Sequence, residues 1–408
     1  MRVLLLNEYY PPDTSATASL AASAVDALIA AGHEVRVVAG WPSYQPLEPW
    51  PWRPARRQVD ADGLRVLRLG STSFDRRSLR ARLANYLTYC AAALPVSLAE
   101  PADVVLSMTD PPFVGVLAAT VAWARRLPFA YWVQDLYPDV AVATGVLRAG
   151  RSLAGSWERA HRWTLGRASR IAVLGLDMAQ RVARAGANPG AIRVVHNGAD
   201  LGPEPEQADR DHPVARRVRS GYDFVALHAG NLGAAGSWEP LIEAAQRLGP
   251  RSGLVFLGGG AGRHDLMQRW GHRPGITFLD PLPPSDARWF MAAADICVVA
   301  LRRGFEGLVV PSKIYGVLAA GRPVLALADD RSELARIVSD HSVGLVADPA
   351  DPVAIGDALA WAETHPDELA QLGRRARAAA ATYDRQLTMR QLAAVVEEAA
   401  AERQGSGR

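Results

Sequence analysis

The sequence contains very little cysteine and almost no lysine. Cys90 and Cys297 are the two cysteines in 408 residues, and they are far apart in the chain. This spacing gives no support for a disulfide framework and is typical of a reducing compartment such as the cytoplasm. Lysine occurs once, as Lys313, and the other 44 of the 45 basic residues are arginine. In such a chain a lone lysine is either chance or a position where arginine is unsuitable.

Long apolar runs and an excess of one charge are also absent. Residues 113–124 are among the longest apolar stretches, well short of the roughly 20 residues that cross a bilayer. Residues 1–6 are too few for the apolar region of a signal peptide and lead straight into Asn7 and Glu8. A net charge of +3 gives no case for nucleic-acid binding. We therefore expect a cytoplasmic protein that at most contacts the inner face of the membrane peripherally.

Short apolar runs rich in Val, Ile and Leu alternate with longer Ala-rich amphipathic stretches, which is typical of repeated βα units around a parallel sheet. The first half contains strand candidates at residues 3–6, 35–39, 104–107, 129–133, 171–174 and 194–196. The second half contains candidates at residues 224–229, 254–258, 276–279, 296–301, 324–328 and 344–346. The expected fold class is α/β, with two doubly wound Rossmann-like domains that face each other across a cleft.

The two halves are separated by residues 201–221, which carry two Pro-Glu steps and mixed charges. We assign residues 1–200 to a first domain, 201–211 to a linker and 212–382 to a second domain, followed by an amphipathic helix over 383–402. Ligands of such sheets bind at the carboxyl ends of the strands. Fold alone leaves nucleotide-sugar chemistry, dinucleotide redox chemistry and hinged small-molecule binding open.

The loop over residues 7–17, after the first strand, is rich in tyrosine and hydroxyl side chains and leads into a helix. No glycine occupies the positions of a dinucleotide fingerprint. The positive end of the helix would favour a phosphate, and small hydroxyl residues would let a phosphate or a sugar come close. Alternatively, Thr14 or Ser15 only caps the helix.

Two glycine-rich turns follow successive strands of the second half. The first contains Gly230 and Gly233, and the second runs from Gly258 to Arg263. Glycine lets the backbone approach a ligand closely, and arginine binds phosphate. One such turn is a weak signal, but two in successive βα units of one domain favour a ligand site.

Residues 304–324 carry the most informative pattern. A glycine-rich loop leads to Pro311 and Ser312 at a helix start, and Gly321 with Pro323 ends that helix about two turns later. The pattern places the Ser312 hydroxyl and the Lys313 ammonium at the positive end of a helix, which is a diphosphate site in outline. By contrast, Asp60-Ala61-Asp62-Gly63 is best interpreted as a hairpin turn rather than a metal motif. No metal-ligand cluster and no covalent hydrolase motif is found in the sequence.

Over nearly its whole length the chain resembles the family 4 glycosyltransferases of the GT-B fold, especially the bacterial branch that builds surface polysaccharides and decorates small molecules. The stretches that carry the resemblance are residues 7–17, 32–35, 134–139, 197–200, 230–233, 311–315 and 321–324. Singly they are weak, and in this order and spacing they are highly specific.

The resemblance implies transfer of a sugar from a nucleoside diphosphate sugar with retention of anomeric configuration, without metal or cofactor. It also implies an acceptor-binding first domain to which the last helix returns, and a donor-binding second domain. For catalysis we expect Asp135, Gln134 and Lys313. For the donor we expect Gly230, Asn231, Gly233, Arg263, Glu306, Gly307, Leu308, Ser312 and Lys313. For the acceptor, a polyprenyl-linked glycan or a small-molecule natural product, we expect Tyr9, Thr14, Ser15, Thr17 and Tyr137.

The chain also departs from the family pattern. The family's paired glutamates would fall at Leu308 and Gly316, and Glu306 takes the place of the first only after a local shift. The arginine and lysine that usually follow the first strand of the donor domain fall at Asn231 and Ala235. Lys313 is the obvious replacement for this positive charge.

Other functions remain open at this point. A nucleotide-sugar epimerase would need acidic and basic groups flanking the sugar, and a sugar-nucleotide-binding protein would need no catalytic group. A phosphorylase with pyridoxal phosphate would have to use Lys313. On the acceptor side, Arg76, Arg77, Arg80 and Arg82 precede an apolar stretch from Leu83 to Val96. This segment is either a packed helix with a solvated end or an interfacial helix on anionic lipid.

Overall fold

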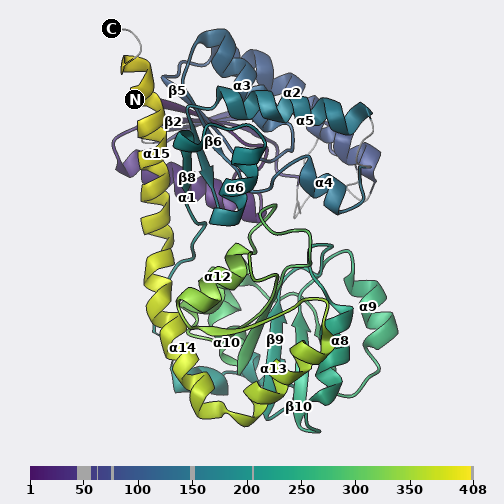
Figure 1. Cartoon of the computed structure of the whole chain (residues 1–408). Helices are drawn as coiled ribbons and strands as arrows, with labels where there is room; N and C mark the ends of the chain where they lie inside the picture. The colour runs from purple at the N-terminus through teal and green to yellow at the C-terminus, as the bar shows by residue number, and fades with distance from the viewer. Residues whose placement is uncertain (44–56, 62, 75–77, 148–151, 205, 406–408) are drawn as a thin grey trace. The chain divides into compact units, whose positions relative to one another are not determined.

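The computed structural model describes residues 1–43, 57–61, 63–74, 78–147, 152–204 and 206–405 (Figure 1). The chain divides into two compact units. Unit 1 contains residues 1–196 and 386–408, and unit 2 contains residues 197–385. The chain therefore enters unit 2 once and returns once, so that unit 1 is built from both ends of the sequence.

Unit 1 is built on an eight-stranded sheet in the order β3-β4-β2-β1-β5-β6-β7-β8. All neighbouring strands are parallel except β3, which pairs antiparallel with β4 at the edge. The strands are β1 (Arg2–Leu6), β2 (Glu34–Gly40), β3 (Arg57–Ala61), β4 (Leu64–Leu69), β5 (Val104–Ser107), β6 (Phe129–Trp132), β7 (Arg170–Val173) and β8 (Ile192–Val194). The helices are α1 (Ala16–Ala30), α2 (Leu79–Ala99), α3 (Val114–Arg125), α4 (Asp139–Ala143), α5 (Ser152–Arg167), α6 (Leu176–Arg184) and α15 (Arg385–Gly405).

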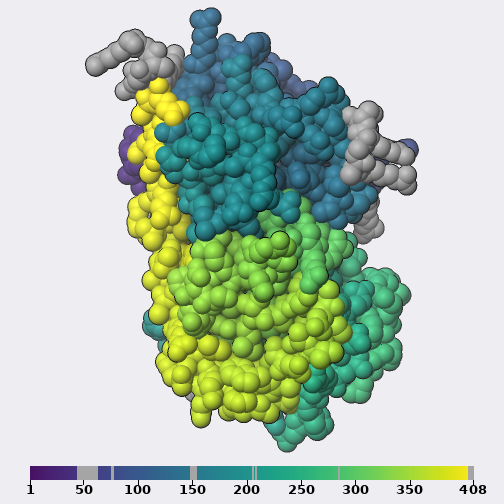
Figure 2. Space-filling view, viewed as in Figure 1, coloured from purple at the N-terminus to yellow at the C-terminus, as the bar shows by residue number. Residues whose placement is uncertain are grey.

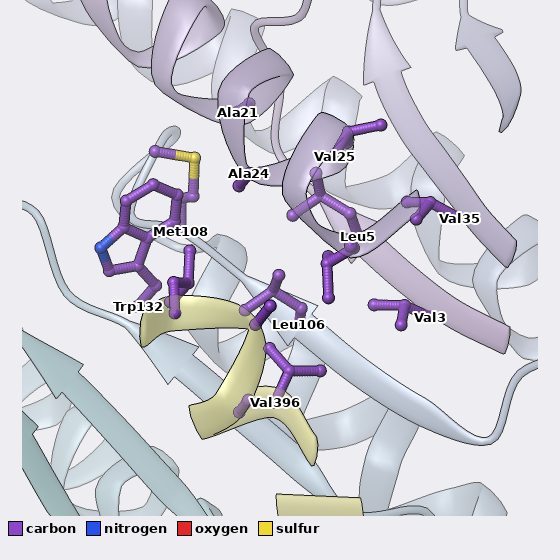
Figure 3. Close-up of a cluster of buried hydrophobic side chains, with 14 of the residues drawn as sticks. Val3, Leu5, Ala21, Ala24, Val25, Val35, Leu106, Met108, Trp132 and Val396 are labelled. Atoms are coloured by element: carbon purple, nitrogen blue, oxygen red, sulfur yellow. The ribbon is translucent and has the colours of Figure 1, made fainter. Parts of the chain in front are cut away.

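The core of unit 1 joins the central strands to helices from both ends of the chain. Val3 and Leu5 of β1 pack with Val25 of α1 and with Val396 of α15, all fully buried (Figure 3). Helix α15 therefore supplies part of the core of unit 1, while its other side stays at the surface (Figure 2). Burial of apolar side chains therefore holds this last helix on a sheet that is formed by the first half of the chain.

Unit 2 is built on a six-stranded parallel sheet in the order β11-β10-β9-β12-β13-β14. Its strands are β9 (Phe224–Ala229), β10 (Ser252–Leu257), β11 (Ile276–Leu279), β12 (Ile296–Ala300), β13 (Val324–Leu327) and β14 (Gly344–Ala347). Its helices are α7 (Pro213–Arg219), α8 (Glu239–Ala244), α9 (Arg263–Trp270), α10 (Ala287–Ala292), α11 (Lys313–Ala319), α12 (Glu333–Asp340), α13 (Pro352–Thr364) and α14 (Pro366–Ala380). The order in which successive strands are added to the sheet reverses between β9 and β12. Doubly wound folds bind ligands at such a switch point.

The expected α/β class with two doubly wound sheets is confirmed. One expected strand was misplaced: β8 spans Ile192–Val194 rather than residues 194–196. The segment 201–221 has more regular structure than the linker expected from the sequence. It contains a 3-10 turn over Gln207–Asp211 and helix α7. Pro213 at the first position of α7 and the His212 ring, which accepts the Val214 N–H, start this short helix despite its polar composition.

Candidate active site

The two glycine-rich turns of unit 2 lie side by side at the carboxyl ends of β9 and β10. The Leu232 N–H donates to the Gly259 carbonyl at 2.8 Å, which ties the turns together. Gly230 and Gly258 have φ values of +140° and +144°, which side chains rarely adopt. A β-carbon at Gly258 would lie 2.2 Å from the Gly230 oxygen. The turns are therefore packed backbone to backbone, and only glycine fits at their contact.

Lys313 begins α11 and its side chain extends over the first of these turns. Its Nζ lies 3.4 Å from the Asn231 carbonyl oxygen, to which it donates. A β-carbon at Gly230 would lie 2.1 Å from Lys313 Cε, so the lysine side chain needs glycine at that position. The structure thus brings together the lone lysine and the first glycine turn, which the sequence analysis identified separately.

His228 lies beside Lys313, at the end of β9. Its side chain is buried, with Nδ1 3.1 Å from the Val298 oxygen and Nε2 3.5 Å from Lys313 Nζ. Burial first, and the charge of Lys313 second, lower the pKa of His228 to about 3. The ring is therefore neutral, and Nε2 presents a lone pair to the ammonium when Nδ1 donates to Val298. His228 holds the lysine in place without neutralising it.

Burial also lowers the pKa of Lys313 to about 8. Among the described residues no carboxylate forms an ion pair with this ammonium. A group of this kind is charged at pH 7, is poorly hydrated and lacks a counter-charge. An anion placed beside the ammonium would supply the missing counter-charge and would replace part of the lost hydration.

The structure gives the other expected donor residues more local partners. The Glu306 carboxylate accepts the Gly304 N–H at 2.9 Å within its own loop, and the Leu308 side chain is buried. Ser312 precedes α11 and is exposed. Arg263 forms an ion pair with Asp280 at 2.8 Å, which offsets part of its charge. Their donor roles remain predictions.

In unit 1, Asp135 follows β6 at the carboxyl edge of the sheet. The Thr109 hydroxyl accepts the N–H groups of Gln134 and Asp135 at 3.3 and 3.2 Å, which joins the loop after β6 to the loop after β5. Burial first, and the neighbouring Asp110 second, raise the pKa of Asp135 to about 7. Asp135 can therefore change its protonation state near neutral pH.

Tyr137 belongs to the same constellation. Its ring stacks on Trp157 of α5, with the ring centroids 5.8 Å apart and the planes 1° from parallel. Burial first, then Asp135 and Asp110, raise the pKa of the Tyr137 hydroxyl, and Arg82 of α2 acts in the opposite direction. Asp135 and Tyr137, both expected from the sequence, are therefore brought together.

The loop after β1 is organised mainly by its own contacts. Ser15 caps α1, because its hydroxyl accepts the Ala18 N–H at 3.1 Å, and Thr17 lies 3.3 Å from the same hydroxyl. Tyr9 is 3% exposed, whereas Thr14 is exposed. The capping interpretation is thus observed for Ser15. The acceptor roles of these four residues stay predictions.

Sequence reasoning missed His228 and Asp110. His228 is a polar side chain in an otherwise apolar strand, directly before a glycine turn, and this position could have identified it. Asp110 follows β5 just as Asp135 follows β6. Since carboxyl ends of neighbouring parallel strands meet at one sheet edge, the pairing of the two was in principle visible.

The Asp60-Ala61-Asp62-Gly63 segment forms the hairpin between β3 and β4, as expected, with Gly63 at φ +74°. Asp62 itself lies outside the described residues. In the part of the chain that the structure describes, no three His, Cys, Asp or Glu side chains are grouped as metal ligands.

Two family models cover most of the chain. The glycosyl transferase 4-like domain matches residues 17–198, and the glycosyl transferases group 1 model matches residues 223–364. The first match lies in unit 1 except for its last two residues, and the second lies in unit 2. Each model therefore corresponds to one of the two sheets.

Relatives with the same assignment are found in bacteria. WbjE of Pseudomonas aeruginosa, named as a glycosyltransferase, is 27% identical over 268 residues, which is 64% of this chain and 66% of WbjE. WcaI of Escherichia coli (strain K12), named as a colanic acid biosynthesis glycosyl transferase, is 24% identical over 358 residues, which is 83% of this chain and 86% of WcaI.

Solved structures share the fold. Sucrose-phosphate synthase from Thermosynechococcus elongatus has a TM-score of 0.76 at 17% identity and covers 98% of this chain and 100% of its own. Anabaena HepE in complex with UDP-glucose has a TM-score of 0.67 at 16% identity and covers 97% of this chain and 98% of its own. Because the two models match both units, the chain belongs to the glycosyltransferases that combine a glycosyl transferase 4-like domain with a group 1 domain, and it has the GT-B fold.

Proposed function

We propose that this glycosyltransferase moves a sugar from a nucleoside diphosphate sugar to an acceptor, with retention of anomeric configuration and without a metal or cofactor. Unit 2 would bind the donor and unit 1 the acceptor. The observation that carries the proposal is the Lys313 ammonium, which lies against the Gly230 turn and forms no ion pair with any described carboxylate.

The chemistry of the leaving group explains why this arrangement suits the reaction. Negative charge grows on the diphosphate as the bond to the sugar breaks, so a positive group fixed beside it stabilises the transition state more than the ground state. Lys313 is held by the Asn231 carbonyl and by His228, so its charge has a fixed position beside the first glycine turn. A solved neighbour of the same fold, HepE, contains UDP-glucose.

On the acceptor side, Asp135 would position the attacking hydroxyl. As a carboxylate it accepts a hydrogen bond from that hydroxyl, and its pKa near 7 makes both protonation states accessible. In a retaining front-face reaction the departing phosphate can take the acceptor proton, so Asp135 need only orient the hydroxyl. Gln134, which is 6% exposed and joined to Asp135 in the same loop, would support that orientation.

A thermal-shift screen against UDP, GDP, ADP and dTDP tests the donor proposal. A ligand that binds only the folded state raises the melting temperature by mass action. We expect one of the four to raise the midpoint of wild type clearly and to raise that of Lys313→Ala much less. No shift with any of them at millimolar concentration would contradict the proposal.

Helix α2 points to an acceptor at a membrane. Its inward side carries Asn85, Tyr89, Ala93 and Ser97, whereas Leu79, Leu83, Leu87 and Leu98 are between 39% and 51% exposed. A surface helix normally turns its leucines inward. The adjacent Phe74, 55% exposed, is fixed to α2 because Asn85 accepts its N–H and donates to its carbonyl, each at 3.0 Å.

Charge favours anionic lipid as the partner of this apolar surface. Arg80 is exposed on the first turn of α2, while Arg76 and Arg77 lie outside the described residues. An exposed leucine stripe beside arginine is the composition of helices that lie in a bilayer interface. No helix within the described ranges is long and apolar enough to cross a membrane. We therefore favour a polyprenyl-linked acceptor over a water-soluble one.

Flotation with anionic liposomes at low salt tests this choice. Wild type should float, and Leu83→Gln with Leu87→Gln should stay with the soluble fraction because the apolar contact is lost. Replacing the four arginines at 76, 77, 80 and 82 by glutamine should also reduce flotation. Val353→Gln is the matched control, since Val353 is 60% exposed on a helix of unit 2. Wild type that stays wholly soluble would indicate a small water-soluble acceptor.

A further inference from the structure

Unit 2 contains a second site, a pocket of about 1140 Å³ at the amino edge of its sheet. Asp223 and Ser252 line it at the starts of β9 and β10, Asp295 precedes β12, and α14 forms a wall. The glycine turns and Lys313 belong to the opposite edge of the same sheet. Because substrates of doubly wound sheets bind at the carboxyl edge, the donor site does not account for this pocket.

The pocket has more positive than negative charge around Asp295. Arg210 and Arg219 bind the Asp295 carboxylate at 2.8 and 3.2 Å, and Arg322 lies within its electrostatic influence. Asp209, which also acts on Arg322, is held by Arg288 at 2.8 Å. Three guanidinium groups therefore act on Asp295, and Arg322 forms no ion pair of its own with any described residue. An anion could pair with it.

The remaining acidic side chains of the pocket are already engaged. Asp223 is bound by Arg251, Glu363 by the Gly249 N–H and the Ser252 hydroxyl, and Glu204 by Arg377. Each of these carboxylates already accepts a hydrogen bond from a neighbouring side chain or backbone N–H group. Arg322 and Arg374, which also line the pocket, form no ion pair with any of these carboxylates or with another described residue.

Two arginines of the pocket have N–H groups that donate to no described residue. Arg322 Nη1 lies 3.3 Å from the Ala294 oxygen, and its Nε is buried without a hydrogen-bond partner in the described chain. Arg374 is exposed on α14 and makes neither a hydrogen bond nor an ion pair with any described residue. A β-carbon at Gly373 would lie 2.6 Å from the Gly321 oxygen, so α14 packs directly on the turn that carries Arg322.

We propose that this pocket binds a small phosphorylated metabolite, with its phosphate monoester on Arg322 and Arg374. Guanidinium groups bind phosphate oxygens through paired N–H donors. The pocket is far larger than a phosphate ion, and Leu369 and Ala370 of α14 offer an apolar wall to an organic body. This inference goes beyond the proposed function and does not depend on it.

The pocket also borders the segment where the chain enters unit 2. Arg377 of α14 donates to the carbonyls of Leu201 and Gly202, which also follow the point where the chain enters unit 2. A ligand bound between Arg322 and α14 would stiffen this entry segment.

Isothermal titration with glucose 6-phosphate as the probe tests the proposal at constant ionic strength. Three proteins are compared: wild type, Arg374→Gln, and Arg375→Gln, whose exposed arginine is adjacent on α14 but does not line the pocket. We expect equal binding by wild type and Arg375→Gln, and about tenfold weaker binding by Arg374→Gln, from loss of a charged hydrogen bond. Glucose should not bind at the same concentrations, and the affinity should be unchanged by UDP.

The outcomes separate this site from the donor site. Equal affinity of wild type and Arg374→Gln, or absence of binding, would overturn the proposal. Displacement of the probe by UDP would place it in the donor site instead. Inorganic phosphate binding as tightly as glucose 6-phosphate would overturn the organic metabolite as ligand. None of these readouts requires sugar transfer, so a failure here leaves the proposed function to its own tests.

Discussion

Replacing Lys313 by alanine is expected to reduce sugar transfer by about 100-fold or more while the protein remains folded. Removal of a fixed group that faces developing charge typically costs this much. The fold should persist because burial lowers the pKa of Lys313 to about 8, which shows that the folded protein disfavours its charged form. The measurement is nucleotide release from the donor identified by thermal shift, with circular dichroism as the check on folding.

Lys313→Arg should lose most of the activity as well. The lysine stem passes over Gly230 where a single added β-carbon would lie 2.1 Å from Cε, and a planar guanidinium is larger than an ammonium. Gly230→Ala should show a similar loss by displacing the lysine. Wild-type turnover in Lys313→Arg would mean that the only lysine is an accident of composition.

The single lysine also permits a chemical control. Amine-directed acylation can modify only Lys313 and the N-terminal amine in this chain. Because the Lys313 pKa is near 8, its amine is more reactive at neutral pH than an ordinary lysine. We expect acylation to inactivate the enzyme and the bound nucleoside diphosphate to protect it. Protection is the decisive part, since the N-terminal amine would not be shielded by a donor at Lys313.

The second large effect is a narrow pH optimum for kcat/KM. The pKa of Asp135 is raised to about 7, so activity that needs its carboxylate rises as pH passes upward through 7. The pKa of Lys313 is lowered to about 8, so activity that needs its ammonium falls as pH passes upward through 8. The two limbs leave a maximum between these values.

Asp135→Asn separates the two limbs. The variant should keep the loss of activity above pH 8 and lose the rise below pH 7, with a lower plateau throughout. In kcat the alkaline limb should move to higher pH than in kcat/KM, because a bound diphosphate favours the charged lysine. An unchanged acidic limb in Asp135→Asn would assign that limb to another group.

Much of the fold was predictable because the relevant signals are local. Continuous apolar runs bounded by glycine and polar residues located β9 and β11 at their observed bounds, and the alternation with amphipathic stretches gave two doubly wound sheets. Helix α7 was not predicted, since seven residues with three arginines carry no apolar periodicity. Its stability comes from Pro213, the His212 cap and packing that sequence does not display.

The candidate site was predictable only in part. The glycine turns and Lys313 follow from spacing, but their mutual contact depends on the positions of β9 and α11 in the sheet. The pKa values of Asp135 and Lys313 could not be predicted, because each shift arises mainly from burial in the folded unit. The amino-edge pocket was also invisible, since Arg322 and Arg374 lie 52 residues apart and line one pocket only because α14 packs on the Gly321 turn at Gly373.

The most direct test of the central claim is a crystal structure with the nucleoside diphosphate that gives the largest thermal shift. The account predicts the diphosphate at the carboxyl edge of unit 2, beside the Gly230 and Gly258 turns, with a phosphate oxygen about 3 Å from Lys313 Nζ. A nucleotide bound in unit 1, or at the amino-edge pocket with Lys313 uncontacted, would contradict it.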